Sequence, residues 1–409
     1  MTFYRNALVV LFTAIFFIDV PGYLSHIDPE IAPINWVIGL YVLLLPVLGK
    51  THGESDILRS PVVVWCFGFW WLSLVSFFLS SQSDIALQVM RWHFFTILII
   101  LGFLILFCDS TAVRLARYAV AAGVLFGVAT NIYELFVPMT FSQLAGRSAG
   151  LYTDPNLSGE ALLLGMIVSV TLFPAWCRGA FILVAGIGVC LTLSRSNILG
   201  WIVVSGTLML LHKVRMKELL VTVLLGLVLV VVALLPMQDQ LLGQLQRAGT
   251  INRDVLERLD WFTNPTGVSD DSAEERKLLA KQAWDRIADR PWLGSGTGAS
   301  HVAGGGMGTH NQYLALMQDH GLLGALIMPL LILAVAWKAR GEIKHLAMIF
   351  GGAVILQSFF SHNMLDLPPR LMLFALMAAF SWSSQSPALN QVQVVRVGDE
   401  RAPKAVVEV

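Results

Sequence analysis

The sequence predicts an all-α protein that crosses a membrane many times, and two observations lead to this fold class. Of the 409 residues, 56% are hydrophobic and 13% are charged, whereas about a quarter of the residues of an ordinary soluble domain are charged. Apolar runs of about twenty residues, the helix length that crosses the apolar core of a bilayer, recur along almost the whole chain. We therefore expect one helical membrane body without a separate soluble catalytic domain.

Twelve apolar runs are predicted to be transmembrane helices, and one long polar segment separates the ninth from the tenth. The predicted organisation is nine helices in residues 1–236, an extramembrane loop at 237–312, three helices in 313–384 and a tail at 385–409. The first run follows Arg5 as in a signal peptide, but no small-residue cleavage site comes after it, so we expect it to be the first helix. The predicted helices cover residues 7–24, 31–49, 61–80, 92–109, 117–137, 157–175, 178–194, 197–212, 218–236, 313–337, 346–364 and 369–384.

The distribution of Lys and Arg predicts the orientation of the chain. If the N-terminus is inside, the cytoplasmic segments hold 15 of these residues, and the short outer loops hold four, at Arg91, Arg147, Arg195 and Arg370. Short cytoplasmic loops retain positive charge, whereas long loops do not follow this rule. We therefore expect both termini to be cytoplasmic and the loop at 237–312 to lie on the outer side.

Several classes of protein are excluded by composition and motif spacing. The formal net charge is zero, so the basic surplus typical of nucleic-acid binding is missing. The four cysteines lie in or beside apolar runs, without the paired spacing of a zinc or redox motif. No group of His, Cys, Asp and Glu has metal-ligand spacing. We predict no nucleic-acid partner, no metal and no cofactor.

The long loop is predicted to contain a helix. Ser272 and Glu275 form a capping-box pattern, and the run 273–290 ends before Pro291, which a helix interior does not accommodate. Arg276 shares one helical face with apolar residues, so we expect it to face protein or membrane, where a cation needs an anionic partner. The apolar residues of this face are Leu279, Ala280, Ala283 and Ile287.

A glycine-rich segment at 294–306 follows this helix and leads to the best candidate for proton transfer, His310. Glycines permit tight turns and the close approach of a ligand. An imidazole titrates near neutral pH and here stands at the outer boundary of a predicted helix, although a single histidine is more often a structural hydrogen-bonding group. His301 is a weaker candidate, and we expect His320 and His362 to be polar residues inside the helix bundle.

Arginine is the cation that the predicted outer side retains, and its planar guanidinium suits phosphate oxygens. Arg147 begins a turn-rich polar stretch, 147–156, directly before a predicted helix. Arg195 lies in a hairpin so short that its guanidinium is expected at the membrane surface. For any one of these arginines, pairing with an acidic residue or a lipid head group is an alternative.

Taken together, these motifs resemble the O-antigen ligase and O-antigen polymerase superfamily of bacterial envelope glycosyltransferases. Their order and common outer location make the combination specific, and the resemblance extends over essentially the whole chain. It implies a GT-C-like fold in the bacterial inner membrane with the active site on the periplasmic face. The matching motifs are the stretch 147–156, Ser194-Arg195-Ser196, the loop with Arg276 and Pro291-Trp292-Leu293-Gly294-Ser295-Gly296, and His310-Asn311-Gln312-Tyr313 followed by Asp319-His320-Gly321.

The resemblance also implies a reaction. A polysaccharide carried by undecaprenyl pyrophosphate would be transferred, with inversion and without metal, to a hydroxyl of lipid A–core. His310 would activate that hydroxyl, and Arg195 and Arg276 would bind the donor pyrophosphate. Arg286 is the alternative to Arg276 as the essential loop arginine. The further predicted substrate-binding residues are Arg147, Asn156, Asn311 and Arg286.

Other functions stay open at this point. A polymerase of the same superfamily would share nearly every feature and differ in its acceptor, and a related protein glycosyltransferase is similar in outline. A transporter or flippase is the alternative from another class, but the hydropathy has no inverted repeat, and the polar motifs gather at the outer surface. A purely structural membrane protein would explain neither the arginine on the apolar helix face nor the glycine-rich segment before His310.

Overall fold

The structure, a computed structural model, is helical throughout the part of the chain that it describes. In that part every regular element is a helix and no strand occurs, which confirms the all-α prediction. The predicted helix at 218–236, the glycines at 304–306 and the tail at 385–409 lie outside the described residues, apart from residue 224. The described residues are 2–48, 59–80, 82–214, 271–302 and 308–383, together with 217, 224, 255 and 256.

The helices follow the predicted order, with a helix in every predicted range that the structure describes. The first group consists of α1 (Thr2–Phe17), α2 (Val20–Ile27), α3 (Pro33–Leu48), α4 (Pro61–Phe78), α5 (Asp84–Leu106), α6 (Ser110–Phe136), α7 (Pro155–Ser169), α8 (Ala175–Leu191) and α9 (Arg195–Leu210). The second group consists of α13 (Asp271–Asp289), α14 (Ala299–Val302), α15 (Gln312–His320), α16 (Gly324–Ala336), α17 (Gly341–Ser358) and α18 (Pro368–Ser383). Short 3-10 turns lie at Gly150–Tyr152, Val170–Leu172 and Gly321–Leu323.

The apolar helices support a membrane protein. Among the described residues, five helical stretches are long and apolar enough to cross a membrane, and six if α1 and α2 count as one bent span. The remaining apolar helices are shorter or less apolar. Membrane character is therefore supported, whereas the count of twelve spans and the periplasmic position of the long loop stay predictions.

The first predicted helix, 7–24, is broken, so the prediction of one continuous helix was wrong. α1 and α2 meet at a bend of 53°. Asp19 has a left-handed backbone with φ of 58°, and its carboxylate accepts a hydrogen bond from the backbone N–H of Gly22 at 3.3 Å. Pro21 has no N–H to continue the α1 ladder but fits the first turn of a new helix. A cap and a proline therefore start α2 where the apolar pattern alone predicts no interruption.

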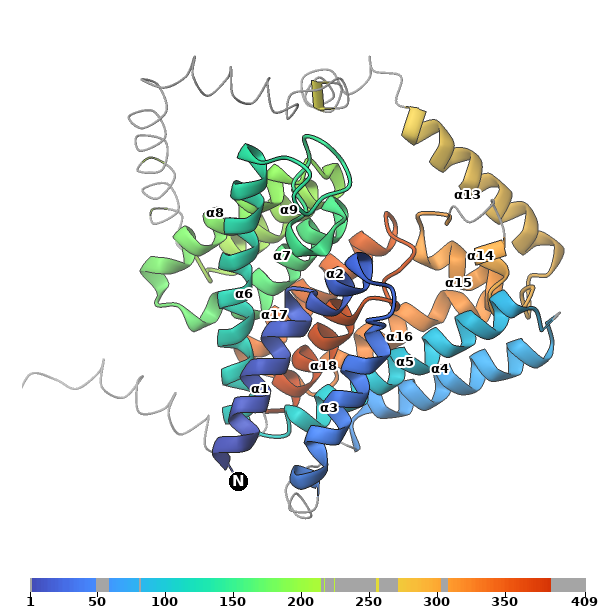
Figure 1. The fold of residues 1–409 in the computed structure, drawn as a ribbon, viewed down its shortest axis with the longest axis horizontal. Coiled ribbons are helices and arrows are strands. Elements are labelled where there is room, and N and C mark those ends of the chain that lie inside the picture. The colour runs from blue at the N-terminus through green and yellow to red at the C-terminus, as the bar shows by residue number, and fades with distance from the viewer. Residues whose placement is uncertain are drawn as a thin grey trace, which may run out of the picture.

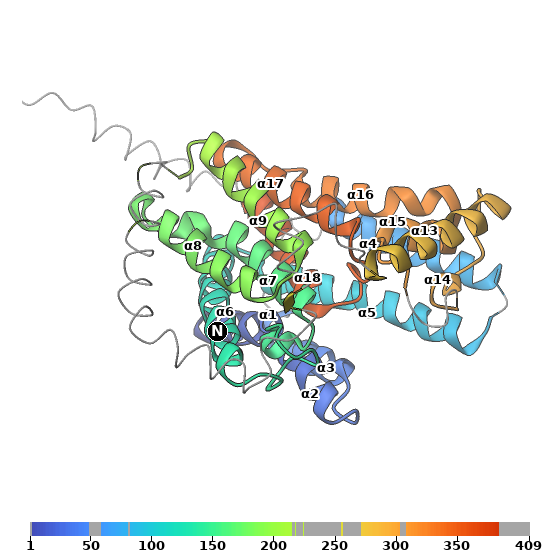
Figure 2. The same ribbon diagram turned by 90° about the horizontal axis from the view of Figure 1, so that it is seen from above.

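Helix α18 lies at the centre of the bundle (Figures 1 and 2). It contacts α1, α5, α6, α7, α16 and α17, and nearly all of its side chains are buried. α7 is buried along almost its whole length as well. The start of α7 and the segment between α17 and α18 therefore meet beside the most tightly enclosed part of the molecule.

Helix α13 confirms the helix predicted in the long loop and packs against α15. Figure 1 shows α13 and α14 at the far end of the molecule from the N-terminus. Leu279, Ala283 and Ile287 are buried, as predicted for the apolar face. Arg276 is exposed, so its predicted place on the buried stripe was wrong: burial on this face begins one turn later, at Leu279.

Candidate functional site

His310 and Asn156 line one cavity of about 130 Å³. Four segments that are far apart in the sequence form it: the starts of α7 and α9, His310 before α15, and the stretch from the end of α17 to Asn363. Arg195 directly precedes two of the lining residues. The cavity is lined by Asp154, Asn156, Leu157, Glu160, Ser196, Asn197, His310, Gln357, Phe360, Ser361, His362 and Asn363.

The loop that carries Arg147 is held by a buried glutamate that sequence analysis did not single out. The carboxylate of Glu134, at the end of α6, accepts hydrogen bonds from the backbone N–H groups of Phe141, Ser142, Ala149 and Gly150. A carboxylate that receives several N–H groups is well stabilised when buried. Glu134 therefore fixes the connection between α6 and α7, and with it the position of Arg147.

Arg147 is buried, with 4% of its surface exposed. Its Nε donates to the carbonyl of Thr192 at 3.1 Å, and one terminal nitrogen donates to Oδ1 of Asn156 at 3.2 Å. The guanidinium therefore links the loop before α7 to the turn before α9. These contacts indicate that Arg147 holds the side chain of Asn156 in place. They do not test the predicted role of Arg147 in phosphate binding.

The start of α9 presents Arg195 in its first turn. Leu193 adopts a left-handed backbone with φ of 49°, which is a strained conformation for a bulky side chain. Ser194, the N-cap residue, makes no side-chain bond to the backbone of this turn; its hydroxyl instead accepts from Nδ2 of Asn197 at 3.0 Å. Asn197 Nδ2 also donates to the carbonyl of Asn156 at 2.7 Å, which joins α9 to α7.

His310 has a left-handed backbone as well, with φ of 49°, a conformation that histidine adopts more readily than most residues. Its ring lies 5.2 Å from the ring of His362, nearly perpendicular to it. His362 was predicted to face the bundle interior, but it lines the cavity beside His310. Nothing in the sequence pattern signals this pairing. The start of α15 meets the segment before α18 through the backbone N–H of Met364, which donates to Oε1 of Gln312 at 2.7 Å.

The surroundings of both histidines favour their neutral forms. Partial burial and the nearby cation Arg276 lower the pKa of His310, while Glu275 and Asp154 oppose this shift. Burial, with a smaller contribution from His310, lowers the pKa of His362 to about 4. A neutral imidazole can accept a proton, so His310 is suited to act as a base near neutral pH.

Asn311 acts as a helix cap. Its side-chain oxygen accepts from the backbone N–H of Leu314 at 3.1 Å, and its carbonyl accepts from the Thr309 hydroxyl at 2.9 Å. An N-cap asparagine satisfies one of the N–H groups that a helix start leaves unpaired. Asn311 therefore sets the direction in which α15 leaves His310, and its predicted role in substrate binding stays untested.

The two alternative loop arginines lie in different surroundings. The positive charge of Arg276 lowers the pKa of His310, which lines the candidate cavity. Arg286 lines a separate cavity of about 310 Å³, together with Ser83 and Gln318. This electrostatic effect on His310 favours Arg276 over Arg286 as the arginine that works with His310.

The glycine-rich segment after Pro291 approaches protein rather than open space. The N–H groups of Ser295 and Gly296 donate to the carbonyls of Gln318 and Asp319 at 2.8 and 3.0 Å, and the Ser300 N–H donates to the Asp319 carboxylate at 2.7 Å. At Gly296, with φ of 97°, an added Cβ would lie 2.2 Å from Cβ of Ser80. The described glycines thus allow this segment to pack closely on the chain itself, where sequence analysis expected a ligand.

One wall of the cavity contains a buried ion pair. The side chains of Glu160 and Arg370 are each 3% exposed and form a salt bridge through Oε2 of Glu160. Arg370 also donates to the carbonyl and to Oδ1 of Asn363, at 2.7 and 2.9 Å. Of the alternatives weighed for the outer arginines, pairing with an acid therefore applies to Arg370. The sequence contains no indication of this pairing, because Glu160 and Arg370 are 210 residues apart.

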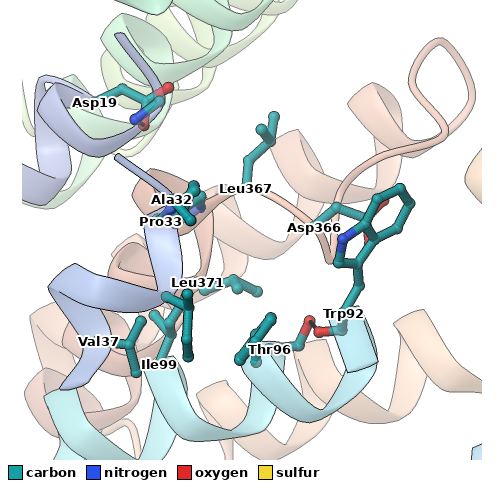
Figure 3. Close-up of a pocket in the computed structure, with 14 residues that line it drawn as sticks. Asp19, Ala32, Pro33, Val37, Trp92, Thr96, Ile99, Asp366, Leu367 and Leu371 are labelled. Carbon is teal, nitrogen blue, oxygen red and sulfur yellow. Dashed lines mark hydrogen bonds between the residues drawn. The ribbon is translucent and has the colours of Figure 1, made fainter. Parts of the chain in front are cut away.

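A larger cavity of about 380 Å³ lies elsewhere, between α3, α5 and the segment before α18 (Figure 3). Its walls are mostly apolar, with Asp19 and Asp366 at different sides. None of the predicted site residues lines it, so it is not the candidate site. Within the described ranges, no group of three or more His, Cys, Asp or Glu residues could hold a metal ion, and the predicted metal independence stays a prediction.

Comparison with known proteins finds a family model that matches part of the chain. Residues 180–329 match the family model described as O-antigen ligase, and this confirms the resemblance over that range. The match includes Arg195, Arg276 and His310, whereas Glu160, His362 and Arg370 lie outside it. A comparison with curated proteins finds no match.

Proposed function

We propose that this chain, which carries a region of the O-antigen ligase family, transfers a polysaccharide from undecaprenyl pyrophosphate to a hydroxyl of lipid A–core on the periplasmic face of the inner membrane and so completes lipopolysaccharide. One observation carries the proposal: His310 shares a cavity with the first turn of α9, directly after Arg195. A base and an anion-binding helix start then face the same small space. The ligase is our first choice, and a polymerase of the same superfamily is the alternative that the test separates.

The start of α9 is suited to the leaving group. The first N–H groups of a helix point outward and carry partial positive charge, so phosphates bind there. Arg195 adds a guanidinium at the same place, and Arg276 contributes positive charge beside His310. As the bond to the pyrophosphate breaks, negative charge grows on its oxygen, and fixed donors of this kind stabilise it without a metal.

His310 is suited to the other half of the reaction. The acceptor hydroxyl oxygen forms a bond to the anomeric carbon, the bond from that carbon to the pyrophosphate oxygen breaks, and the hydroxyl proton passes to His310. The lowered pKa of His310 keeps the imidazole neutral and able to accept this proton. Attack from the side opposite the leaving group inverts the anomeric configuration.

The test is a transfer assay with purified protein, undecaprenyl-pyrophosphate-linked polysaccharide and lipid A–core, with and without a chelator. We expect glycan on lipid A–core with the wild type, and a loss of about 10²- to 10⁴-fold in rate for His310→Ala, the range for removal of a general base. His212→Ala is the matched control, because His212 is exposed and lies past the opposite end of α9.

The products separate the alternatives. Longer lipid-linked chains without glycan on lipid A–core would indicate the polymerase. Loss of activity with the chelator that returns on adding a divalent cation would contradict the metal-independent mechanism. No product from verified substrates would contradict the proposed transfer and favour a transporter.

A further inference from the structure

We propose that the wall of the His310 cavity formed by Glu160, Gln357, Phe360, Ser361 and Asn363 binds one sugar ring of a glycan substrate, and that a hydroxyl of this ring donates a hydrogen bond to Oε1 of Glu160. This rests on the proposed transfer reaction for the identity of the ligand. It goes beyond that reaction because it assigns the recognition of a sugar ring to residues outside the matched family region.

The first observation is an unsatisfied carboxylate oxygen. Oε2 of Glu160 is bound by Arg370, whereas Oε1 is buried and has no hydrogen-bond partner among the described residues. Glu160 is 2% exposed, yet it lines the cavity. Leaving a buried acceptor unpaired costs about 1–3 kcal/mol, and more if the group is charged. A hydroxyl donor in the cavity would remove this penalty.

The second observation is that Glu160 cannot turn away to find another partner. Arg370 holds Oε2 and is itself held by two hydrogen bonds to Asn363. Asn363 in turn accepts a hydrogen bond from the Ser361 hydroxyl at 2.6 Å. The carboxylate is therefore fixed in advance of binding, and a fixed acceptor loses little conformational freedom when a ligand arrives.

The third observation is the chemistry of the other lining groups. Gln357, Ser361 and Asn363 offer amide and hydroxyl groups, which both donate and accept hydrogen bonds. Phe360, 41% exposed, adds an apolar face beside them. A sugar ring presents hydroxyls at its edge and C–H groups on its face, and this combination matches an apolar surface with a few placed polar groups.

The charge of this wall differs from that of the start of α9, where the pyrophosphate is proposed to bind. Glu160 and Asp154 carry the acidic groups of the lining, and the charge of Arg370 is already balanced by Glu160. Since Glu160 and Arg370 balance each other, this wall has no net positive charge to attract a pyrophosphate, whereas the start of α9 does attract it. The sugar and the phosphate therefore take different parts of one cavity, which His310 also lines.

The sugar could come from the acceptor or from the first residue of the donor glycan, since both present the same chemistry. The test is steady-state kinetics of purified Glu160→Gln, in which the amide keeps the shape of the side chain but replaces the charged acceptor. We expect KM for one of the two substrates to rise about 10-fold or more, with kcat within a few-fold of the wild type. The substrate whose KM rises is the source of the sugar.

Phe360→Ala provides a second test that does not disturb the ion pair. Loss of the aromatic face is expected to raise the same KM about 2- to 10-fold. Phe359→Ala is its matched control, because Phe359 is the adjacent residue, is 52% exposed and packs on Tyr313, away from the cavity lining. If Glu160→Gln does not fold, Phe360→Ala against Phe359→Ala decides the question.

Both KM values unchanged in the folded variants, or a fall in kcat alone, would overturn the sugar-binding wall while leaving the transfer reaction intact. Binding of two free saccharides, core oligosaccharide released from lipid A and donor polysaccharide released from its pyrophosphate, is measured in parallel by saturation-transfer NMR. Wild-type binding that Glu160→Gln weakens, in a protein without transfer activity, would retain the wall and reject the proposed function. Binding of neither saccharide to the wild type, with unchanged KM values, would overturn the inference.

Discussion

The starts of α7 and α9 line the same cavity, but only the start of α7 has a side-chain cap. Asp154 caps α7: its carboxylate accepts from the N–H groups of Asn156 and Leu157 at 2.7 and 3.2 Å. At α9, Ser194 makes no such bond, and its hydroxyl is occupied by Asn197 instead. A side-chain cap satisfies the first backbone N–H groups of a helix, whereas a helix start without such a cap can offer these N–H groups to a ligand. The difference agrees with the proposal, in which α7 supports the site and the anion binds at α9.

The largest effect that follows from this comparison is expected at α9. Arg195→Ala removes the guanidinium beside the uncapped start and should lower kcat about 10²- to 10³-fold, the range for loss of one donor that stabilises developing charge. Thermal unfolding should be nearly unchanged, because Arg195 is partly exposed at the helix end. The rate is measured in the transfer assay, and Arg114→Ala, an exposed arginine at the start of α6, serves as the control. A large loss of stability in Arg195→Ala would instead indicate a structural residue.

A smaller effect, and of the opposite kind, is expected at α7. Asp154→Ala removes the cap and should lower the free energy of unfolding by about 0.5–2 kcal/mol. Thermal unfolding in detergent measures this, and Asp154→Asn is the matched variant because an asparagine oxygen still caps a helix. If both variants lost equal stability, capping would not be the role of Asp154.

The helices of this comparison could be predicted from the sequence, but the contacts between them could not. Apolar length and the proline before Asn156 place the start of α7, and the short hairpin places Arg195 at the start of α9. The resemblance then singled out His310 together with these arginines, and the structure places His310 in one cavity with the first turn of α9. Periodicity and local motifs carry this information because they depend on neighbouring residues.

The residues that were missed act over long separations. Glu134 accepts four backbone N–H groups of the following loop, Glu160 pairs with Arg370, and His362 lies against His310. In one sequence each of them is a single polar residue in or beside an apolar helix. Partners of this kind become visible only once packing brings helices together. The exposure of Arg276 was missed for the same reason. The apolar face of α13 predicts which residues pack against another helix, but not how much of that face α15 covers.

The hairpin before α9 provides the next prediction, with a smaller effect. Leu193 has φ of 49°, and such strain costs about 1–3 kcal/mol for a bulky residue. Glycine adopts this conformation freely but loses about 0.5–1 kcal/mol through the entropy of the unfolded chain. Leu193→Gly should therefore leave stability equal or raise it slightly, as measured by thermal unfolding. Leu183→Gly, in the interior of α8, is the control and should destabilise. Destabilisation of Leu193→Gly by as much as this control would show that the Leu193 side chain, not the strain of its backbone, dominates.

The smallest effect is a displacement of the pH profile, and it tests whether His310, which lines the same cavity as the two helix starts, acts as the base. Because burial and Arg276 lower the pKa of His310 below its usual value of 6.5, the neutral base persists into mildly acidic solution, and kcat/KM should fall only below that pH. Arg276→Gln removes the cation, so the pKa of His310 should rise and the acid limb should move to higher pH. Glu275→Gln removes an anion that raises the same pKa, so the limb should move to lower pH.

The position of the acid limb is the readout rather than the height of the plateau, because Arg276 is also proposed to bind the donor. Both displacements should shrink at high salt, since exposed charges are screened, and displacements of the same sign in the two variants would mean that another group limits the rate.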